Sequence, residues 1–355
     1  MRVLGTLAVT HSSRRVNLAR CSVQFLTSRF GDPERLANLP PFDSLPPPET
    51  LYSGALSLYR VVLDDRGRYD LAPLGHLKDR EKIQHAAFLD ATDLLVGYER
   101  RVERWRLSAP IDRLGRFSRA NATLVGRFEH PHLADLHTVA PLADGRVALA
   151  CSAADAVLLW EPLTGAVETL RMPAALYGHN YTLTAETDLR SHAIGDPQQT
   201  THVNAAHPAG PGQLVVSTLI QGAIGVFDLA GHPPGYRELV SGFVGCHGAR
   251  RSAEGEIYFA DSTAGMLLFL DDQGGIARRF AVPSRWLHDV QQIAGSVYAF
   301  AVSDHNDVRL YDIESGELLV RRRSFTWPVE RLFPVARALP FWLGNTTQAL
   351  SFLPA

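Results

Sequence analysis

Residues 286–317 read WLHDVQQIAGSVYAFAVSDHNDVRLYDIESGE, and this stretch decides the expected fold. Short apolar or alternating runs are separated by turn residues, among them Gly295 and the triplet Glu314-Ser315-Gly316. Such runs joined by tight turns are typical of antiparallel β-hairpins. The stretch and the residues after it therefore predict four short strands, at 288–293, 297–302, 308–313 and 318–323.

The same unit recurs along the chain. Further copies begin near Cys246, Thr201, Leu136 and Gln84, and an incomplete copy of three strands begins near Val329. Aligned on the first strand, the copies share one position, which is occupied by His85, His137, His202, His247, His288 and Glu330. A four-stranded unit repeated in one phase predicts a β-propeller, in which a closed ring leaves only short edges.

The repeat predicts one all-β domain, a single β-propeller over residues 1–355 with regular blades starting near 85, 137, 202, 247, 288 and 330. Residues 1–80 contain enough strand signal for an additional, irregular blade. Seven blades is therefore the expected number, with six as the alternative, and the N- and C-terminal strands are expected to close the ring. Two insertions, 27–52 and 172–200, fall outside the repeat.

The composition is that of a globular protein without a charged binding face. Of the 355 residues, 46% are hydrophobic and 20% are charged, and the formal net charge is −2. This balance gives no electrostatic footprint for nucleic acid or an anionic membrane. Three widely spaced cysteines form no disulfide framework, and no signal peptide or membrane span is evident. We expect a cytoplasmic protein with a small-molecule substrate; the oligomeric state is left open.

The line HGARRSAEGEIYFADSTAGMLLFLD, from His247 to Asp271, resembles the repeat of NHL-type and streptogramin-lyase-like propellers. The resemblance covers about residues 84–355 as architecture. It implies that the first strand of each blade lines a central channel, so that the five phased histidines and Glu330 would surround one axis. It also implies that the 172–200 insertion emerges on the same face. The WD-repeat signature is absent, since Trp160 is followed by Glu161.

A ring of histidines points to a metal site, because neutral imidazole is the commonest metal ligand. The candidate ligands are His85, His137, His202, His247 and His288. Iron is the favoured ion, and zinc and copper are alternatives. The segments HPHLADLH (130–137) and HVN (202–204) also look loosely similar to motifs of histidine-iron propeller oxygenases. The structural alternative is that repeat duplication has propagated hydrogen-bonded core histidines.

These observations favour a metal-dependent enzyme, with an iron oxygenase or other oxidoreductase acting on a small organic substrate as the leading hypothesis. A divalent-metal-assisted lyase or hydrolase with a histidine general base is one alternative. A non-catalytic propeller scaffold is another. The candidate catalytic residues are His202, His247 and Glu330, with Asn204 and Asp289 as hydrogen-bonding supports, and the candidate substrate contacts in the long insertion are Tyr177, His179 and Tyr181.

Overall fold

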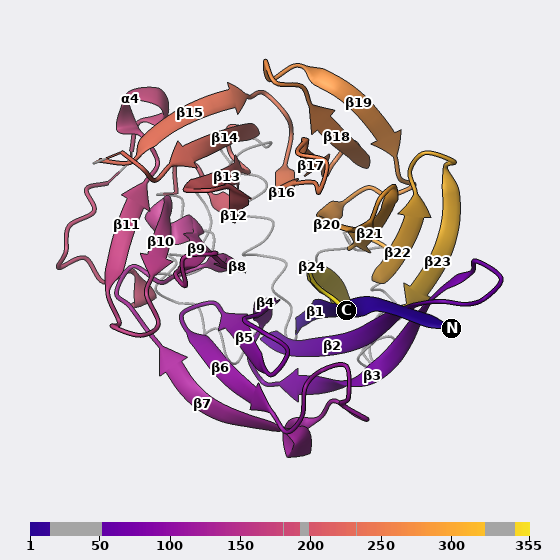
Figure 1. Ribbon diagram of the computed structural model, residues 1–355. Helices are drawn as coiled ribbons and strands as arrows, with labels where there is room; N and C mark the ends of the chain where they lie inside the picture. Colours follow the sequence, from indigo (N-terminus) through magenta and orange to yellow (C-terminus); the bar gives the residue numbers. More distant parts are fainter. Residues whose placement is uncertain (15–51, 180, 192–198, 232, 324–344) are drawn as a thin grey trace.

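The computed structural model describes residues 1–14, 52–179, 181–191, 199–231, 233–323 and 345–355. These residues form six antiparallel sheets of four strands, arranged as blades around a central axis (Figure 1). The β-propeller expected from the repeat is therefore confirmed. The expected number of seven blades is wrong, and the alternative of six is correct.

Each blade runs from an inner strand at the axis to an outer strand at the rim. The first blade contains β24 (Asn345–Pro354), β1 (Arg2–Arg14), β2 (Tyr52–Leu63) and β3 (Tyr69–Asp79). The second contains β4 (Ile83–Phe88), β5 (Asp93–Tyr98), β6 (Val102–Leu107) and β7 (Ala122–Phe128). The third contains β8 (Leu136–Pro141), β9 (Val147–Cys151), β10 (Ala156–Trp160) and β11 (Val167–Arg171).

The other three blades follow the chain in the same order. The fourth contains β12 (Val203–Gly210), β13 (Gln213–Thr218), β14 (Ala223–Asp228) and β15 (Gly235–Val240). The fifth contains β16 (Cys246–Arg251), β17 (Ile257–Asp261), β18 (Met266–Leu270) and β19 (Ile276–Ala281). The sixth contains β20 (Leu287–Ala294), β21 (Val297–Val302), β22 (Asp307–Asp312) and β23 (Glu317–Arg323).

Ring closure explains why the expected blade number was too high. The C-terminal strand β24 pairs with β1, from Gly5 opposite Pro354 to Ser13 opposite Asn345. It becomes the inner strand of the blade whose other three strands come from the N-terminal segment. The two terminal segments, which the sequence suggests as two separate blades, therefore complete one sheet. Residues 324–344, with Glu330, and the insertion at 27–51 lie outside the described residues.

Burial differs between the inner and the outer strands of a blade. Strands β5 and β9 are buried at every residue, because both of their faces pack against neighbouring blades. Strand β19 alternates between half-buried and exposed residues, because only one of its faces meets the core. These second strands of their blades are therefore rich in apolar residues throughout, and the outer strand β19 alternates.

Polar side chains tie adjacent blades together near the axis. The Ser152 hydroxyl donates to the Val203 carbonyl at 2.8 Å, and the Asn204 amide donates to the Cys246 carbonyl at 2.6 Å. The Thr10 hydroxyl donates to the Gln84 carbonyl at 3.0 Å. The axis is thus a rigid frame for the side chains that project into it. No helix among the described residues is long and apolar enough to span a membrane.

Candidate metal centre at the propeller axis

A β-bulge near the start of most inner strands sets which side chains face the axis. In β8, β12 and β20 the ladder skips one residue, and that residue is His137, Asn204 and His288 respectively. A bulge inserts one extra residue into a strand and redirects its side chain. His247 follows Cys246 in β16 as His137 follows Leu136 in β8, so it belongs to the same set.

The strand registers correct the alignment of two histidines. In β4 the skipped residue is Gln84, so His85 lies one position later than His137 does in its own strand. His202 precedes β12, and its carbonyl accepts the Leu219 amide as the Asp135 carbonyl accepts the Ser152 amide. His202 is therefore the counterpart of Asp135, and Asn204 is the counterpart of His137.

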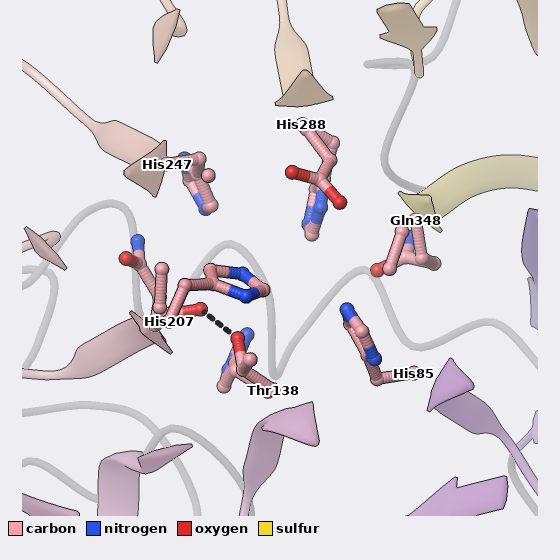
Figure 2. Close-up of a pocket in the computed structure, with 12 residues that line it drawn as sticks. His85, Thr138, His207, His247, His288 and Gln348 are labelled. Atoms are coloured by element: carbon pink, nitrogen blue, oxygen red, sulfur yellow. Dashed lines mark hydrogen bonds between the residues drawn. The ribbon is translucent and has the colours of Figure 1, made fainter. Parts of the chain in front are cut away.

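The described inner strands enclose a small axial cavity (Figure 2). Its volume is about 10 Å³, which is about the room that one water molecule or one ion needs. An organic substrate does not fit into this space. The side chains that line the cavity include five histidines, two amides and one carboxylate: His85, His137, His207, His247, His288, Asn204, Gln348 and Asp289.

Four of the histidines that line the cavity, His85, His207, His247 and His288, are neutral at ordinary pH because they are buried. Desolvation lowers the pKa of His85 and of His247 to about 4. It also holds the pKa values of His207 and His288 well below the usual 6.5, with nearby basic groups adding to the effect. Burial disfavours the charged form of histidine. The lone pairs of these rings are therefore available as ligands or hydrogen-bond acceptors.

Two hydrogen bonds define how His247 presents its ring. Its Nδ1 lies 3.1 Å from the Gly245 carbonyl oxygen and 2.7 Å from the Ser262 hydroxyl. A carbonyl only accepts, so Nδ1 carries the proton and Nε2 carries the lone pair. The His247 and His288 ring centroids are 4.7 Å apart. This pair thus brings two imidazoles from adjacent blades together at the cavity.

A second group of donor atoms lies where β8 and β12 begin. One ligand atom from each of Asp135, His137 and His202 lies within 4.8 Å of the other two. The His137 Nε2 atom is 3.4 Å from Asp135 Oδ1, and the His202 Nδ1 atom is 3.9 Å from Asp135 Oδ2. The two rings meet edge to face, with centroids 4.8 Å apart. Among the described residues, this group alone gathers three such donors so closely.

Gln199 fixes the orientation of two members of this group. Its amide nitrogen donates to Asp135 Oδ2 at 3.1 Å, and its amide oxygen lies 2.6 Å from His202 Nδ1. Because the carboxylate only accepts, the amide oxygen must face His202, and His202 Nδ1 must donate. The lone pair of His202 is therefore on Nε2. Supporting hydrogen bonds of this kind are typical of histidines that bind metals.

The backbone at this place is held in an uncommon conformation. Asp135 and His202 have φ angles of +50° and +52°, in the left-handed region. The buried Asp155 carboxylate accepts the His202 amide at 3.0 Å and the Thr201 amide at 2.6 Å, which holds the segment in place. Left-handed non-glycine residues are uncommon and concentrate at functional sites.

The donor set fits a metal ion. Asp135 is 3% exposed, and the His137 Nε2 atom lies 3.4 Å from its Oδ1 atom without good hydrogen-bond geometry. A buried carboxylate oxygen that is only weakly satisfied would be stabilised by a cation. Two imidazoles and one carboxylate bind iron(II) or zinc and leave coordination positions open. The group can therefore hold a metal and still bind a further ligand.

A buried carboxyl group lies close to this donor set. Glu99 is 4% exposed, and neither of its carboxyl oxygens has a hydrogen-bond partner among the described residues. Its Oε1 atom is 3.9 Å from Lys82 Nζ. Burial raises the pKa of Glu99 to about 7, Lys82 opposes this rise and Asp135 adds to it. This end of the axis is therefore rich in ionisable groups.

The expected substrate contacts of the insertion lie away from the axial cavity. The Tyr177 hydroxyl, at the end of the short helix α4 (Ala174–Tyr177), donates to Glu238 at 2.6 Å and lies 2.8 Å from the Tyr236 hydroxyl on β15. Tyr181 donates to the Ala153 carbonyl. The His179 Nε2 atom lies 2.7 Å from the Met172 carbonyl oxygen. These contacts attach the insertion to the third and fourth blades.

The two expected hydrogen-bonding supports, Asn204 and Asp289, contact residues other than the histidines beside them, and four residues of the site were not expected. Asn204 links β12 to β16, and Asp289 pairs with Arg250. His207 projects into the cavity from β12, with its ring centroid 6.0 Å from that of His85. The unexpected residues are His207, Asp135, Gln199 and Gln348. Only Asp135 carries a sequence signal, because it immediately precedes a first strand, as His202 does.

Comparison by sequence finds no matching family model and no matching characterised protein. Similar solved structures include a chain of the nidogen/laminin complex, with 11% identity over 98% of both chains and a TM-score of 0.56. They also include virginiamycin B lyase from Staphylococcus aureus, with 10% identity over 78% of this chain and 83% of the lyase and a TM-score of 0.49. The C-terminal WD40 domain of Sif2 shares 14% identity, over 78% of this chain and 69% of that one, with a TM-score of 0.45. The likeness is one of propeller fold.

Proposed function

We propose that this protein is a metal-dependent enzyme whose divalent ion is bound by Asp135, His137 and His202. One observation carries the proposal: three donor atoms from two adjacent blades lie within 4.8 Å of one another in a buried place. Gln199 supports it, because its amide orients both the carboxylate and one imidazole.

Iron(II) is the ion that this donor set favours. Two histidines and one carboxylate on one side of the ion are typical of non-haem iron(II) oxygenases. When bound, such an ion supplies oxygen activation or polarises a substrate oxygen. The cavity of about 10 Å³ is too small for an organic molecule. We therefore infer that a small organic substrate approaches from the end of the axis where β8 and β12 begin.

A hydrolase or lyase is the second candidate, and His247 is the observation that favours it. The same donors bind zinc in enzymes that activate water. The His247 Nδ1 proton is held by Gly245 and Ser262, so Nε2 is presented as a base. The identity of the bound metal separates the two candidates, since oxygenation needs a redox-active ion.

Metal analysis of the purified protein and of Asp135→Asn tests the proposal. We expect about one iron or zinc ion per wild-type chain after anaerobic reconstitution and a large loss in Asp135→Asn. Asp144→Asn is the matched control, because Asp144 is exposed in the turn between β8 and β9. An unchanged metal content in a folded Asp135→Asn protein would sink the proposal. So would a wild-type protein that binds neither ion.

A further inference from the structure

We propose that the axial cavity is a second metal site, which binds one copper(I) ion through His247 and His288, with His85 as a further ligand. Of the three proposed divalent ligands, His137 lines this cavity, whereas Asp135 and His202 do not. The two sites therefore adjoin at His137. The copper ligands proposed here are different residues from the divalent ligands, so either proposal can fail without the other.

The first argument is the direction of the lone pairs. The His247 Nδ1 proton is held by Gly245 and Ser262, which leaves the Nε2 lone pair free. The backbone of Gln348 hydrogen-bonds the His288 ring, which likewise leaves one nitrogen as a lone pair. Both rings point into the cavity (Figure 2). Two acceptors from adjacent blades thus face one small space, and a cation between them would meet both lone pairs.

The second argument is the lack of partners around His85. This side chain is 2% exposed, and neither of its ring nitrogens has a hydrogen-bond partner among the described residues. A buried polar group without a partner is destabilising, and such a group in a folded protein requires an explanation. His85 lines the same cavity as His247 and His288. An ion there would give its lone pair a partner.

The third argument is charge. Among the described lining residues the only carboxylate is Asp289, and the guanidinium of Arg250 occupies both of its oxygens. The cavity therefore offers neutral donors only. The cost of burying an ion rises with the square of its charge, so a monovalent ion is far less costly here than a divalent one. Imidazole suits copper, and copper(I) accepts low coordination numbers with neutral donors.

The fourth argument is size. A volume of about 10 Å³ accommodates one ion and excludes a chelated or heavily hydrated one. The His247 and His288 rings are already 4.7 Å apart between centroids. His85 lies across the cavity (Figure 2), and the axial histidines do not form a group of three within 4.8 Å. Binding therefore needs a side-chain rotation that brings His85 toward the ion.

Copper(I) titration under anaerobic conditions tests this site. The full chain is titrated against bicinchoninate, which reports free copper(I) by its colour. We expect the wild type and Asp135→Asn each to withdraw one equivalent, and His247→Gln/His288→Gln to withdraw none. His305→Gln is the control for losing a histidine outside the cavity, since that side chain is 46% exposed. Loss of copper binding in Asp135→Asn but not in the double variant would overturn the proposal.

A second measurement covers the case in which the double variant fails to fold. Copper(I) is diamagnetic, so nitrogen NMR of the wild type follows each histidine ring during the titration. We expect the largest shifts at His247 and His288, followed by His85. Shifts confined to His137 and His202 would place the ion in the divalent site and overturn the proposal. A wild type that leaves all the copper with bicinchoninate would overturn it as well.

Discussion

Arg250 of β16 and Asp289 of β20 form a buried ion pair across two neighbouring blades, with both Nη atoms of the guanidinium donating to the carboxylate. Arg250 Nη2 also donates to the Leu350 carbonyl at 3.0 Å, and Asp289 Oδ2 accepts the Leu350 amide at 2.8 Å. The pair therefore joins the fifth and sixth blades to the strand that closes the ring.

Arg250→Met should destabilise the protein strongly, because it leaves the Asp289 charge buried without its partner. We expect the free energy of unfolding to fall by about 3–5 kcal/mol. Urea denaturation measures this change. Arg68→Met is the control, since the Arg68–Asp64 pair is largely exposed on the arginine side and should contribute little to stability. Equal effects of the two substitutions would show that the axial pair does not hold the ring.

Gln199→Leu should weaken the divalent site without removing a ligand. The substitution removes the donor to Asp135 and the acceptor for His202, so both ligands lose their fixed orientation. We expect metal affinity to fall by about 10–100-fold, as is usual for partners that orient ligands. Competition with a zinc-binding dye measures the affinity. Gln292→Leu is the control, since this half-buried glutamine of β20 is outside the donor set, and it should leave the affinity unchanged. An unchanged affinity in Gln199→Leu would contradict the orienting role.

His11 should make the protein sensitive to acid. Burial, with a smaller effect of His76, lowers the pKa of His11 to about 3 in the folded state. In the unfolded chain the His11 ring takes up a proton below about pH 6.5, whereas in the folded protein it stays neutral. The free energy of unfolding is therefore retained above that pH and decreases as the pH falls below it. In His11→Gln, the free energy of unfolding should decrease with falling pH less steeply than in the wild type, by about 1.4 kcal/mol per pH unit between pH 6 and 4.

Urea denaturation at several pH values measures the slope for His11→Gln. The exposed His305→Gln is the matched control for removing one histidine. Equal slopes for the wild type and His11→Gln would mean that His11 is already protonated in the folded protein. They would also mean that its burial does not contribute to acid unfolding.

Tyr177→Phe distinguishes a structural role of the insertion from a role in substrate binding. The substitution removes the hydroxyl contacts to Glu238 and Tyr236, which attach α4 to β15. We expect a loss of about 1 kcal/mol in the free energy of unfolding and no change in metal affinity. Thermal denaturation and the dye competition measure the two quantities. A change in turnover with unaltered stability would instead support substrate contact by Tyr177.

Local features of the fold were readable from the sequence. The four strands expected within 288–323 match β20 to β23 to within a residue or so at each end, because alternation and turn residues are local signals. The number of blades was not readable in this way. Alternation marks a strand without indicating which sheet it joins, and only the pairing of β24 with β1 shows that two terminal segments share one blade.

The alignment of the candidate site residues was also only partly predictable from the sequence, because it depends on strand pairing. An alignment by sequence spacing treats every residue as one step of the strand, whereas a β-bulge leaves one residue unpaired. The alignment therefore placed His85 and His202 at the position of His137, which neither of them occupies. The cluster of Asp135 with His137 and His202 depends on contact between two adjacent blades, which no local pattern encodes. Glu330, outside the described residues, stays a prediction.

The seam between β1 and β24 has a consequence for protein engineering. Since the first and last strands of the ring are neighbours in one sheet, a short linker between residues 1 and 355 would make the ring covalently continuous. New ends could then be opened in any exposed turn between blades, and every blade would become a hairpin meander of consecutive strands.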